Sequence, residues 1–112
     1  MIIAVDFDGT LHFPIPGKRC IGRPNLPLIE KLIELRANNN EVILWTCRDG
    51  DSLDEAVQWC KAQGLEFDAI NDNTEKTKEE HLRLFGSIGR KIYANVYIDD
   101  RASYPREFVV WF

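Results

Sequence analysis

The sequence predicts one α/β domain, a three-layer structure in which a parallel sheet of about five strands carries helices on both faces. Two observations predict it. Short apolar runs typical of buried strands alternate with longer stretches whose apolar residues recur at helical spacing. The connections between these runs are too long for hairpins, so the strands should be parallel. The 112 residues suffice for one hydrophobic core and leave no room for a second.

The first half of the chain supplies two of the expected strands. Residues 2–5 are an uninterrupted apolar run, which is typical of a buried strand. Residues 12–25 are rich in proline and should form an irregular excursion with a small hairpin that turns near Pro16. A helical stripe of leucine and isoleucine follows over residues 25–36, and residues 41–45 read as the second buried strand.

The second half is punctuated by helix signals. Two capping-box patterns, Ser52 with Glu55 and Thr77 with Glu80, predict where two helices start. The first of these helices should end at Gly64, and the second should end at Phe85, closed by Gly86. The remaining expected strands are a short one at residues 65–70, one at residues 93–98 and a last short one from Phe108 to Trp111.

Composition excludes several classes of protein. Apolar residues make up 45% and charged residues 29% of the chain, as in ordinary globular proteins. The net charge of −4 leaves no basic stripe for a nucleic-acid backbone, so nucleic acid is an unlikely partner, whereas a small phosphorylated substrate needs only one or two local cations. No apolar run is long enough to span a membrane.

The cysteines and histidines form no metal pattern. Cys20, Cys47 and Cys60 are odd in number and have no paired spacing, and the N-terminus shows no signal peptide. We therefore expect reduced thiols and a cytoplasmic protein. Neither His12 nor His81 lies near a pair of cysteines, so no zinc site is expected.

The first strand ends on two aspartates, and this is the most informative feature of the chain. Asp6 and Asp8 are followed by Gly9, which allows a sharp turn, and by Thr10, which adds a hydroxyl group. Two carboxylates at the end of a buried strand are costly unless a cation lies between them. A hard divalent cation with oxygen ligands would meet that need.

Polar residues also follow two other predicted strands. Thr46 and Arg48 come directly after residues 41–45, and Asp99 and Asp100 come directly after residues 93–98. Because the carboxyl ends of parallel strands share one edge of a sheet, where ligands of open α/β folds bind, these residues should meet Asp6 and Asp8 there. Arg48 could make a bidentate contact to a phosphate or a carboxylate.

The segment from Asp6 to Leu11, Asp-Phe-Asp-Gly-Thr-Leu, resembles the first signature of the haloacid dehalogenase-like (HAD) phosphohydrolases. This resemblance implies a Rossmann-like fold and a magnesium-dependent phosphatase. In it Asp6 is the nucleophile that forms an aspartyl-phosphate and Asp8 is the general acid and base. Gly9 and Thr10 are then expected to bind the substrate from the turn, with support of the loop as the alternative role for Thr10.

Three further signatures extend the resemblance. Thr46 matches the second, whose hydroxyl group bonds a phosphoryl oxygen. Asp99-Asp100 resembles the fourth, and the implied magnesium ligands are Asp6, the backbone carbonyl of Asp8 and one or both of that pair, with Asp100 favoured as the more direct ligand. The third signature is a lysine: Lys91 fits best, and the rivals are Lys76 and Lys78.

Family members enclose their substrates with cap inserts, and this chain has room for none. The resemblance therefore implies a small capless member with an open site, in which residues 12–25 are a possible flap. Two alternatives remain: a non-catalytic phosphate- or metal-binding protein of the same fold, and a receiver-like phospho-acceptor module, whose order of acidic residues fits less well. The apolar residues 108–112 leave an oligomer possible.

Overall fold

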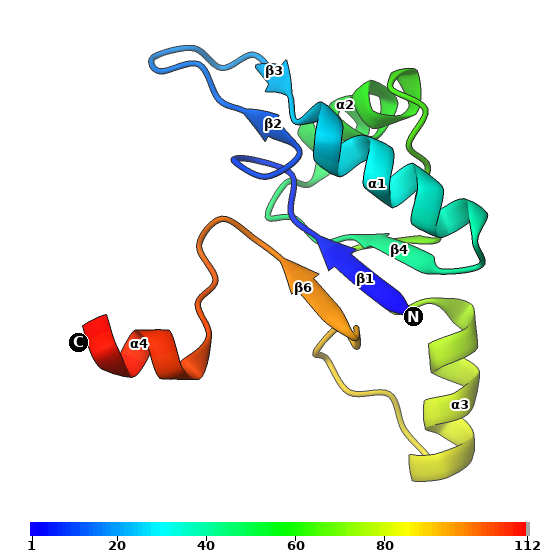
Figure 1. The fold of residues 1–112 in the computed structure, drawn as a ribbon. Helices are drawn as coiled ribbons and strands as arrows, with labels where there is room; N and C mark the ends of the chain where they lie inside the picture. Colours follow the sequence, from blue (N-terminus) through cyan, green and yellow to red (C-terminus); the bar gives the residue numbers. More distant parts are fainter. Residues whose placement is uncertain (112) are drawn as a thin grey trace.

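The computed structural model describes residues 1–111, and at its centre lies a parallel sheet of four strands in the order β5-β4-β1-β6 (Figure 1). The strands are β1 (Ile2–Val5), β4 (Glu41–Leu44), β5 (Ala69–Ile70) and β6 (Val96–Ile98). All three pairings between neighbours are parallel. The prediction of an α/β fold with a parallel sheet flanked by helices is confirmed.

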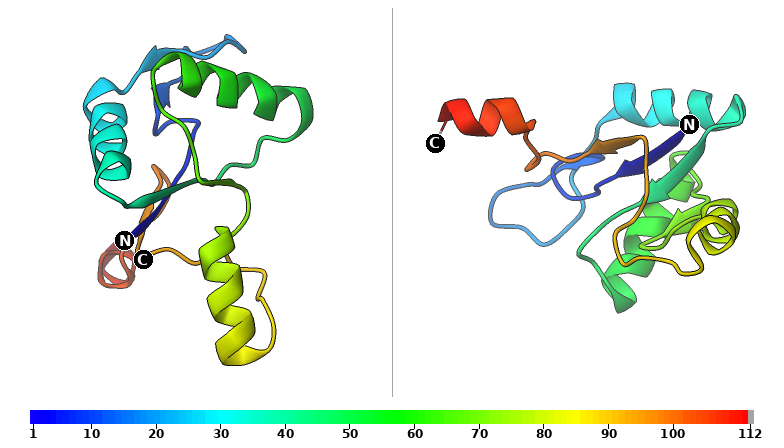
Figure 2. Two further views of the ribbon diagram at one scale, coloured as in Figure 1. Left: turned by 90° about the vertical axis from the view of Figure 1, so that its right-hand side faces the viewer. Right: turned by 90° about the horizontal axis from the view of Figure 1, so that it is seen from below.

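Helices α1 (Leu26–Ala37) and α2 (Gly50–Ala62) lie on the same side of the sheet (Figures 1 and 2). Side chains alternate along a strand, so every second residue of β1 and β4 points toward these helices. The buried residues of this main core are Ile3, Val5, Phe7, Leu11, Ile29, Leu32, Val42, Leu44, Ala56, Cys60 and Leu65. This core fixes the position of β1, the strand that leads into Asp6.

The other face of the sheet has a smaller cluster of buried residues, formed by Ala4, Ile43 and Ile92. Helix α3 (Glu75–Phe85) lies on this side, and Figure 2 shows it extending away from the sheet. Its N-cap, Thr74, is buried and donates a hydrogen bond from its hydroxyl group to Glu41 at the start of β4. The beginning of α3 therefore lies near the amino end of β4.

The excursion at residues 12–25 contains the expected hairpin. Strands β2 (His12–Phe13) and β3 (Arg23–Pro24) pair antiparallel, and the amide of Lys18 donates to the carbonyl of Ile15 in the turn between them. In Figure 1 the hairpin extends from the end of the sheet to which β1 points. It therefore begins close to the predicted site.

The C-terminal strand predicted from Phe108 to Trp111 is wrong, and so is the count of five strands. These residues form α4 (Pro105–Trp111), which lies away from the sheet in Figures 1 and 2. Pro105 opens the helix, a position where proline's missing N–H costs nothing. The valines of this stretch favour strands mainly through packing against neighbours in a sheet, and here no sheet receives them.

The helix starts predicted from capping boxes are also wrong. Helix α2 begins at Gly50 and has Asp49 at its N-cap, while the Ser52 hydroxyl donates to the Asp49 carbonyl from inside the first turn. Helix α3 begins at Glu75, and its N-cap is Thr74, three residues before the predicted cap, because the Thr74 hydroxyl accepts the amide of Thr77. The predicted end of α3 is confirmed, since Gly86 adopts a left-handed conformation there with φ of 74°.

Within residues 1–111, none of the helices combines the length and the apolar character that crossing a membrane requires.

Candidate active site at the carboxyl edge of the sheet

The strand register brings the sequence-predicted residues to one edge of the sheet. Val5 pairs with Ile98 on one side and with Leu44 on the other, so the residue after each of these strands lies beside Asp6. The Asp6 amide donates to the carbonyl of Ile98 at 2.9 Å, which places Asp6 next to Asp99. The prediction that three strand ends share one edge is confirmed.

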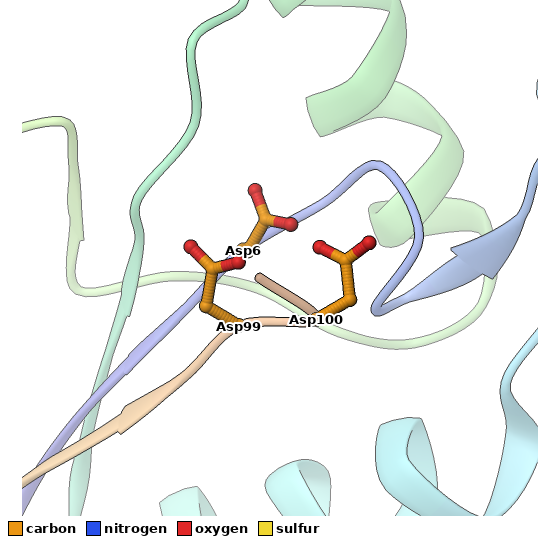
Figure 3. Close-up of side chains that lie close together, drawn as sticks. All are labelled: Asp6, Asp99 and Asp100. Atoms are coloured by element: carbon orange, nitrogen blue, oxygen red, sulfur yellow. The ribbon is translucent and has the colours of Figure 1, made fainter. Parts of the chain in front are cut away.

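Three carboxylates gather at this edge. Asp6, Asp99 and Asp100 each offer one oxygen, and these oxygens lie within 4.8 Å of one another. Figure 3 shows the three side chains around a common space, Asp6 from the end of β1 and the other two from the end of β6. We call this group the acidic cluster. Asp6 is half-buried, whereas Asp99 and Asp100 are exposed.

The Thr10 hydroxyl group ties the two strands of the acidic cluster together. It donates to an Asp6 carboxylate oxygen at 3.1 Å and accepts the backbone amide of Asp100 at 3.1 Å. Thr10 is buried, and Asn25 donates to its carbonyl from the start of α1. The predicted substrate-binding role of Thr10 therefore competes with a bracing role, because both hydrogen-bonding functions of its hydroxyl are used within the protein.

Gly9 is required for this geometry. Its φ of 81° is in the left-handed region, which favours glycine. A Cβ atom at this position would lie 2.9 Å from Cγ of Asp100, closer than carbon atoms pack. The glycine predicted to lie beside the substrate therefore also makes room for the Asp100 carboxylate.

The environment of Asp6 favours the protonated form of its carboxyl group. Burial and the nearby charges of Asp99 and Asp100 raise the pKa of Asp6 from 3.8 to about 6, while the hydrogen bonds from Thr10 and from the amide of Phe7 act in the opposite direction. A cation at the acidic cluster would offset the repulsion among these carboxylates.

Asp8 lies outside the acidic cluster and is paired with two basic side chains. Arg48 donates from Nε to Oδ2 and from Nη2 to Oδ1, both at 2.9 Å, and His12 Nε2 lies 2.9 Å from Oδ1. The hydrogen bond from Arg48 lowers the pKa of Asp8, and the bond from His12 lowers it further, against the opposing effect of burial. The Asp8 side chain is 46% exposed, so solvent still reaches it.

Arg48, predicted to contact a substrate anion, is used inside the protein. Besides its bidentate contact with Asp8, its Nη1 donates to the carbonyl of Ser52 at 3.1 Å. Its guanidinium group lies over the Phe7 ring, 4.8 Å from the centroid. Arg48 therefore acts on Asp8 rather than on an open anion site in this arrangement.

Sequence reasoning missed His12, because the sequence pattern shows it as an isolated histidine. The side chain is buried and bonds Asp8, four residues earlier. Spacing of four residues suggests contact only on a helix, and here the chain turns through Gly9 and enters β2 instead. The polar residue directly after the apolar Leu11, inside an otherwise core-forming segment, was the available signal.

Thr46 is placed at the end of β4 by a residue that sequence reasoning also missed. Asn71 Oδ1 accepts the Thr46 amide at 2.8 Å, and Asn71 itself has a positive φ of 52°. The Thr46 hydroxyl accepts the amide of Arg48 at 3.1 Å. Among residues 1–111 no acceptor takes the Thr46 hydroxyl proton, so that proton can be donated to a ligand.

The three candidate lysines differ in position. Lys91 Nζ lies 5.4 Å from the Tyr97 ring centroid, and Lys91 lines the same open groove as Asp99. Lys78 pairs with Asp72 at 2.6 Å, and Lys76 lines a pocket with Glu41, toward the amino end of β4. Across the described chain, no lysine ammonium group lies within ion-pair distance of the acidic cluster.

A solved structure from Bacteroides thetaiotaomicron, described as a conserved protein coded by a locus of that organism, is similar to this chain. The two sequences are 38% identical, the match covers 99% of this chain and 86% of that chain, and the TM-score is 0.73. The chain belongs to the family of this conserved protein. The likeness covers β1, β4 and β6 of the family fold, and hence the edge where the acidic cluster lies.

No protein-family model and no functionally curated protein matches the sequence.

Proposed function

We propose that the protein is a magnesium-dependent phosphohydrolase with an HAD-like fold and no cap domain, which cleaves phosphate monoesters through an aspartyl-phosphate on Asp6. The observation that carries this proposal is the acidic cluster, in which one oxygen each of Asp6, Asp99 and Asp100 lie within 4.8 Å of one another. The match of Asp6 to Leu11 with the first HAD signature supports it.

The donor set of the acidic cluster suits a hard divalent cation. Three carboxylates from two strand ends supply oxygen ligands, and magnesium is usually held by one or two carboxylates together with substrate phosphate and water. Asp6, Asp99 and Asp100 would hold the ion, which neutralises negative charge on the transferring phosphoryl group when bound. Asp8 would contribute through its backbone carbonyl, since its carboxylate is bonded to Arg48 and His12.

Asp6 is the proposed nucleophile. One of its oxygens attacks phosphorus while the bond to the leaving oxygen breaks, and water then attacks the phosphoryl group so that the bond to Asp6 breaks. The hydrogen bond from Thr10 fixes the orientation of the carboxylate. Near neutral pH most of the Asp6 side chains are ionised, because the pKa is about 6.

Asp8 is the proposed proton-transfer group. Its lowered pKa makes it a carboxylate, the form that takes a proton from the attacking water. To protonate the leaving oxygen in the first step, Asp8 must receive a proton when substrate is bound. Thr46 would donate its hydroxyl proton to a phosphoryl oxygen, and Lys91, which lines a groove with Asp99, remains the proposed lysine.

A binding protein of the same fold without turnover is the second candidate. It is favoured by one observation: within residues 1–111 no lysine ammonium group lies within ion-pair distance of the acidic cluster. In that case the site would hold a cation or a phosphate and release no product.

Phosphate release from an activated aryl phosphate and from a panel of phosphorylated metabolites, measured with and without magnesium, tests the proposal. We expect magnesium-dependent release by the wild type and a loss of about a thousandfold or more in Asp6→Asn. Asp54→Asn, an exposed carboxylate on α2, is the matched control and should keep full activity. Equal activity of Asp6→Asn and wild type would contradict the nucleophile, and no release from any substrate would favour the binding protein.

A further inference from the structure

His12 is a buried histidine whose two ring nitrogens both have partners. The residue is 1% exposed. Its Nδ1 lies 3.0 Å from the backbone nitrogen of Gly22, and its Nε2 lies 2.9 Å from Oδ1 of Asp8. The ring thus connects the residue that precedes β3 of the hairpin with one of the two aspartates of the site.

The partners determine which nitrogen of the neutral ring carries the proton. A backbone N–H can only donate, so Nδ1 must present its lone pair to Gly22. The ring proton of the neutral imidazole is then on Nε2, from which it is donated to the Asp8 carboxylate. The hairpin amide therefore orients the donor that Asp8 receives.

Aromatic packing holds the ring in this orientation. The Phe7 centroid lies 4.7 Å from that of His12, and the Trp59 centroid lies 6.2 Å away in an edge-on arrangement. Phe7 belongs to the main core between the sheet and α2, so the ring rests on a rigid surface.

Gly22 is equally constrained. A Cβ atom there would overlap the carbonyl group of Phe13, whose carbon would be 2.9 Å away, so only glycine allows the chain before β3 to approach Phe13 this closely. The antiparallel pairing of His12 with Pro24 and of Phe13 with Arg23 closes the base of the hairpin around the ring.

The hydrogen bonds to Asp8 are unequal at its two oxygens. Oδ1 accepts both His12 Nε2 and Arg48 Nη2, whereas Oδ2 accepts only Arg48 Nε among the donors of residues 1–111. A carboxylate oxygen accepts two hydrogen bonds readily, so Oδ2 is the oxygen with a lone pair left for a proton from water or substrate. Without His12, both oxygens would be equally available and Asp8 could tilt in the plane of the guanidinium group.

We infer that His12 is a positioning residue for Asp8, and that it couples the base of the hairpin to the choice of Asp8 oxygen that takes part in proton transfer. This inference rests on the proposed function for its catalytic consequence. The hydrogen-bonded chain from Gly22 through His12 to Asp8 stands without it.

Two conservative variants separate the two bonds of the ring. The amide of Gln reaches the Nε2 position, so His12→Gln keeps a donor for Asp8 and loses the acceptor for Gly22; the shorter His12→Asn keeps the acceptor and loses the donor. With the best substrate of the phosphate-release panel, we expect His12→Gln to keep kcat within about threefold and His12→Asn to lower kcat by about ten- to a hundredfold at nearly constant KM.

Equal losses of kcat in both variants, or a larger loss in His12→Gln, would overturn the positioning role and leave His12 as a support of the hairpin. His81→Gln, at a half-buried position of α3, is the control for substitution of a histidine. Circular dichroism and thermal unfolding of each variant confirm that the compared proteins are folded.

A nuclear magnetic resonance measurement tests the hydrogen-bonded chain without any turnover. Long-range ¹H–¹⁵N spectra of ¹⁵N-labelled protein at neutral pH should show a single His12 tautomer, protonated on Nε2, with His81 as the internal comparison. A proton on Nδ1, or an average of the two tautomers, would overturn the inference even in an active enzyme. If no substrate is cleaved but the Nε2–H tautomer is found, the proposed function fails while the coupling of Gly22 to Asp8 holds.

Discussion

Asp6 and Asp8 are two residues apart and of the same type, yet their surroundings are opposite. Asp6 faces two other carboxylates, and burial with their charge raises its pKa to about 6. Asp8 faces Arg48 and His12, and their hydrogen bonds lower its pKa. The left-handed turn at Gly9 directs the chain away from β1 and brings His12 back to Asp8, and so gives Asp8 a neighbour that Asp6 does not have.

This difference suggests how one short motif supports two roles. A group surrounded by like charges needs a cation before it ionises fully, which suits a metal ligand and nucleophile. A group already paired with a cation stays ionised and can accept a proton from water. The neighbours contributed by other segments, Asp99 and Asp100 on one side and Arg48 on the other, determine which aspartate has which property.

The largest effect should come from disturbing the Asp6 side at Gly9. Gly9→Ala forces a side chain into the left-handed region and against Asp100, and we expect a loss of about 2–3 kcal/mol of unfolding free energy together with weaker magnesium binding. Gly17→Ala is the matched control, since Gly17 also has a positive φ of 74° and no atom would lie within 4 Å of the new Cβ. Thermal unfolding and calorimetric titration with magnesium measure both; equal losses of stability in the two variants would show that Asp100 is not crowded by Gly9.

Removing the Thr10 hydroxyl group should increase the difference in pKa between Asp6 and Asp8. Thr10→Val keeps the shape of the side chain but loses the bonds to Asp6 and to the Asp100 amide, at a cost of about 1–2 kcal/mol. The pKa of Asp6 should rise further above 6, because Thr10 lowers it in the wild type. Thr10→Ser retains the hydroxyl group, so its unfolding free energy and the pKa of its Asp6 should stay close to those of the wild type. The carboxyl ¹³C shift of Asp6 measures its titration midpoint. An unchanged midpoint in Thr10→Val would contradict the bracing role of the Thr10 hydroxyl group.

Removing Arg48 should reduce the difference in pKa between Asp6 and Asp8 by changing the pKa of Asp8. In Arg48→Met the pKa of Asp8 should rise toward its ordinary value, and the unfolding free energy at neutral pH should fall by about 1 kcal/mol, a modest value because Asp8 is half exposed. A lowered pKa stabilises the folded state above the unfolded value near 3.8, and this contribution is lost as the pH falls below it.

The stability difference between Arg48→Met and wild type should therefore shrink in acid. Denaturant unfolding at neutral pH and below pH 3.8 measures it, with Arg83→Met on the exposed surface of α3 as the control. A difference of constant size across this range would mean that Arg48 stabilises by packing on Phe7 and not through Asp8.

The smallest effect concerns the metal-free protein. A carboxyl group with a raised pKa stabilises the folded state fully in acid, and that contribution is lost as the pH rises from about 3.8 to about 6. Asp6→Asn has no carboxyl group to ionise at this position. Without magnesium the variant should therefore be up to about 1 kcal/mol more stable than the wild type at pH 7. The control Asp54→Asn should show no such gain in stability. Excess magnesium should reverse the order, as measured by thermal unfolding.

The sequence was sufficient for the parts of the fold that depend on buried apolar runs. β1, β4 and the hairpin lie where the sequence predicts them, because the first two are continuous buried runs and the third is marked by its prolines. The C-terminal stretch was predicted wrongly, since its valines have strand propensity but no strand beside them to pair with. The start of α3 was displaced because the Thr74 hydroxyl caps it ahead of the capping-box pattern, whereas α2 starts at Gly50 with no side-chain capping bond from Asp49.

For the candidate site, the sequence predicted the sheet edge at which the residues gather but not the hydrogen-bond partners of Asp8 and Thr46. Asp6, Asp99 and Thr46 could be brought together from strand order alone, because parallel strands end at one edge. The bonds from Arg48 and His12 to Asp8 depend on a turn through Gly9 and on the return of the hairpin, which no local pattern specifies. The same limit applies to Asn71, whose contact with Thr46 spans 25 residues.

A pH titration of the carboxyl ¹³C shifts of Asp6 and Asp8, in metal-free protein and again with magnesium, tests the difference between the two aspartates directly. We expect a midpoint near pH 6 for Asp6 and one below 3.8 for Asp8; magnesium should lower the first and leave the second unchanged. A midpoint shared by the two residues, or an Asp6 midpoint that magnesium does not move, would contradict the assignment of a cation ligand to Asp6 and a paired carboxylate to Asp8.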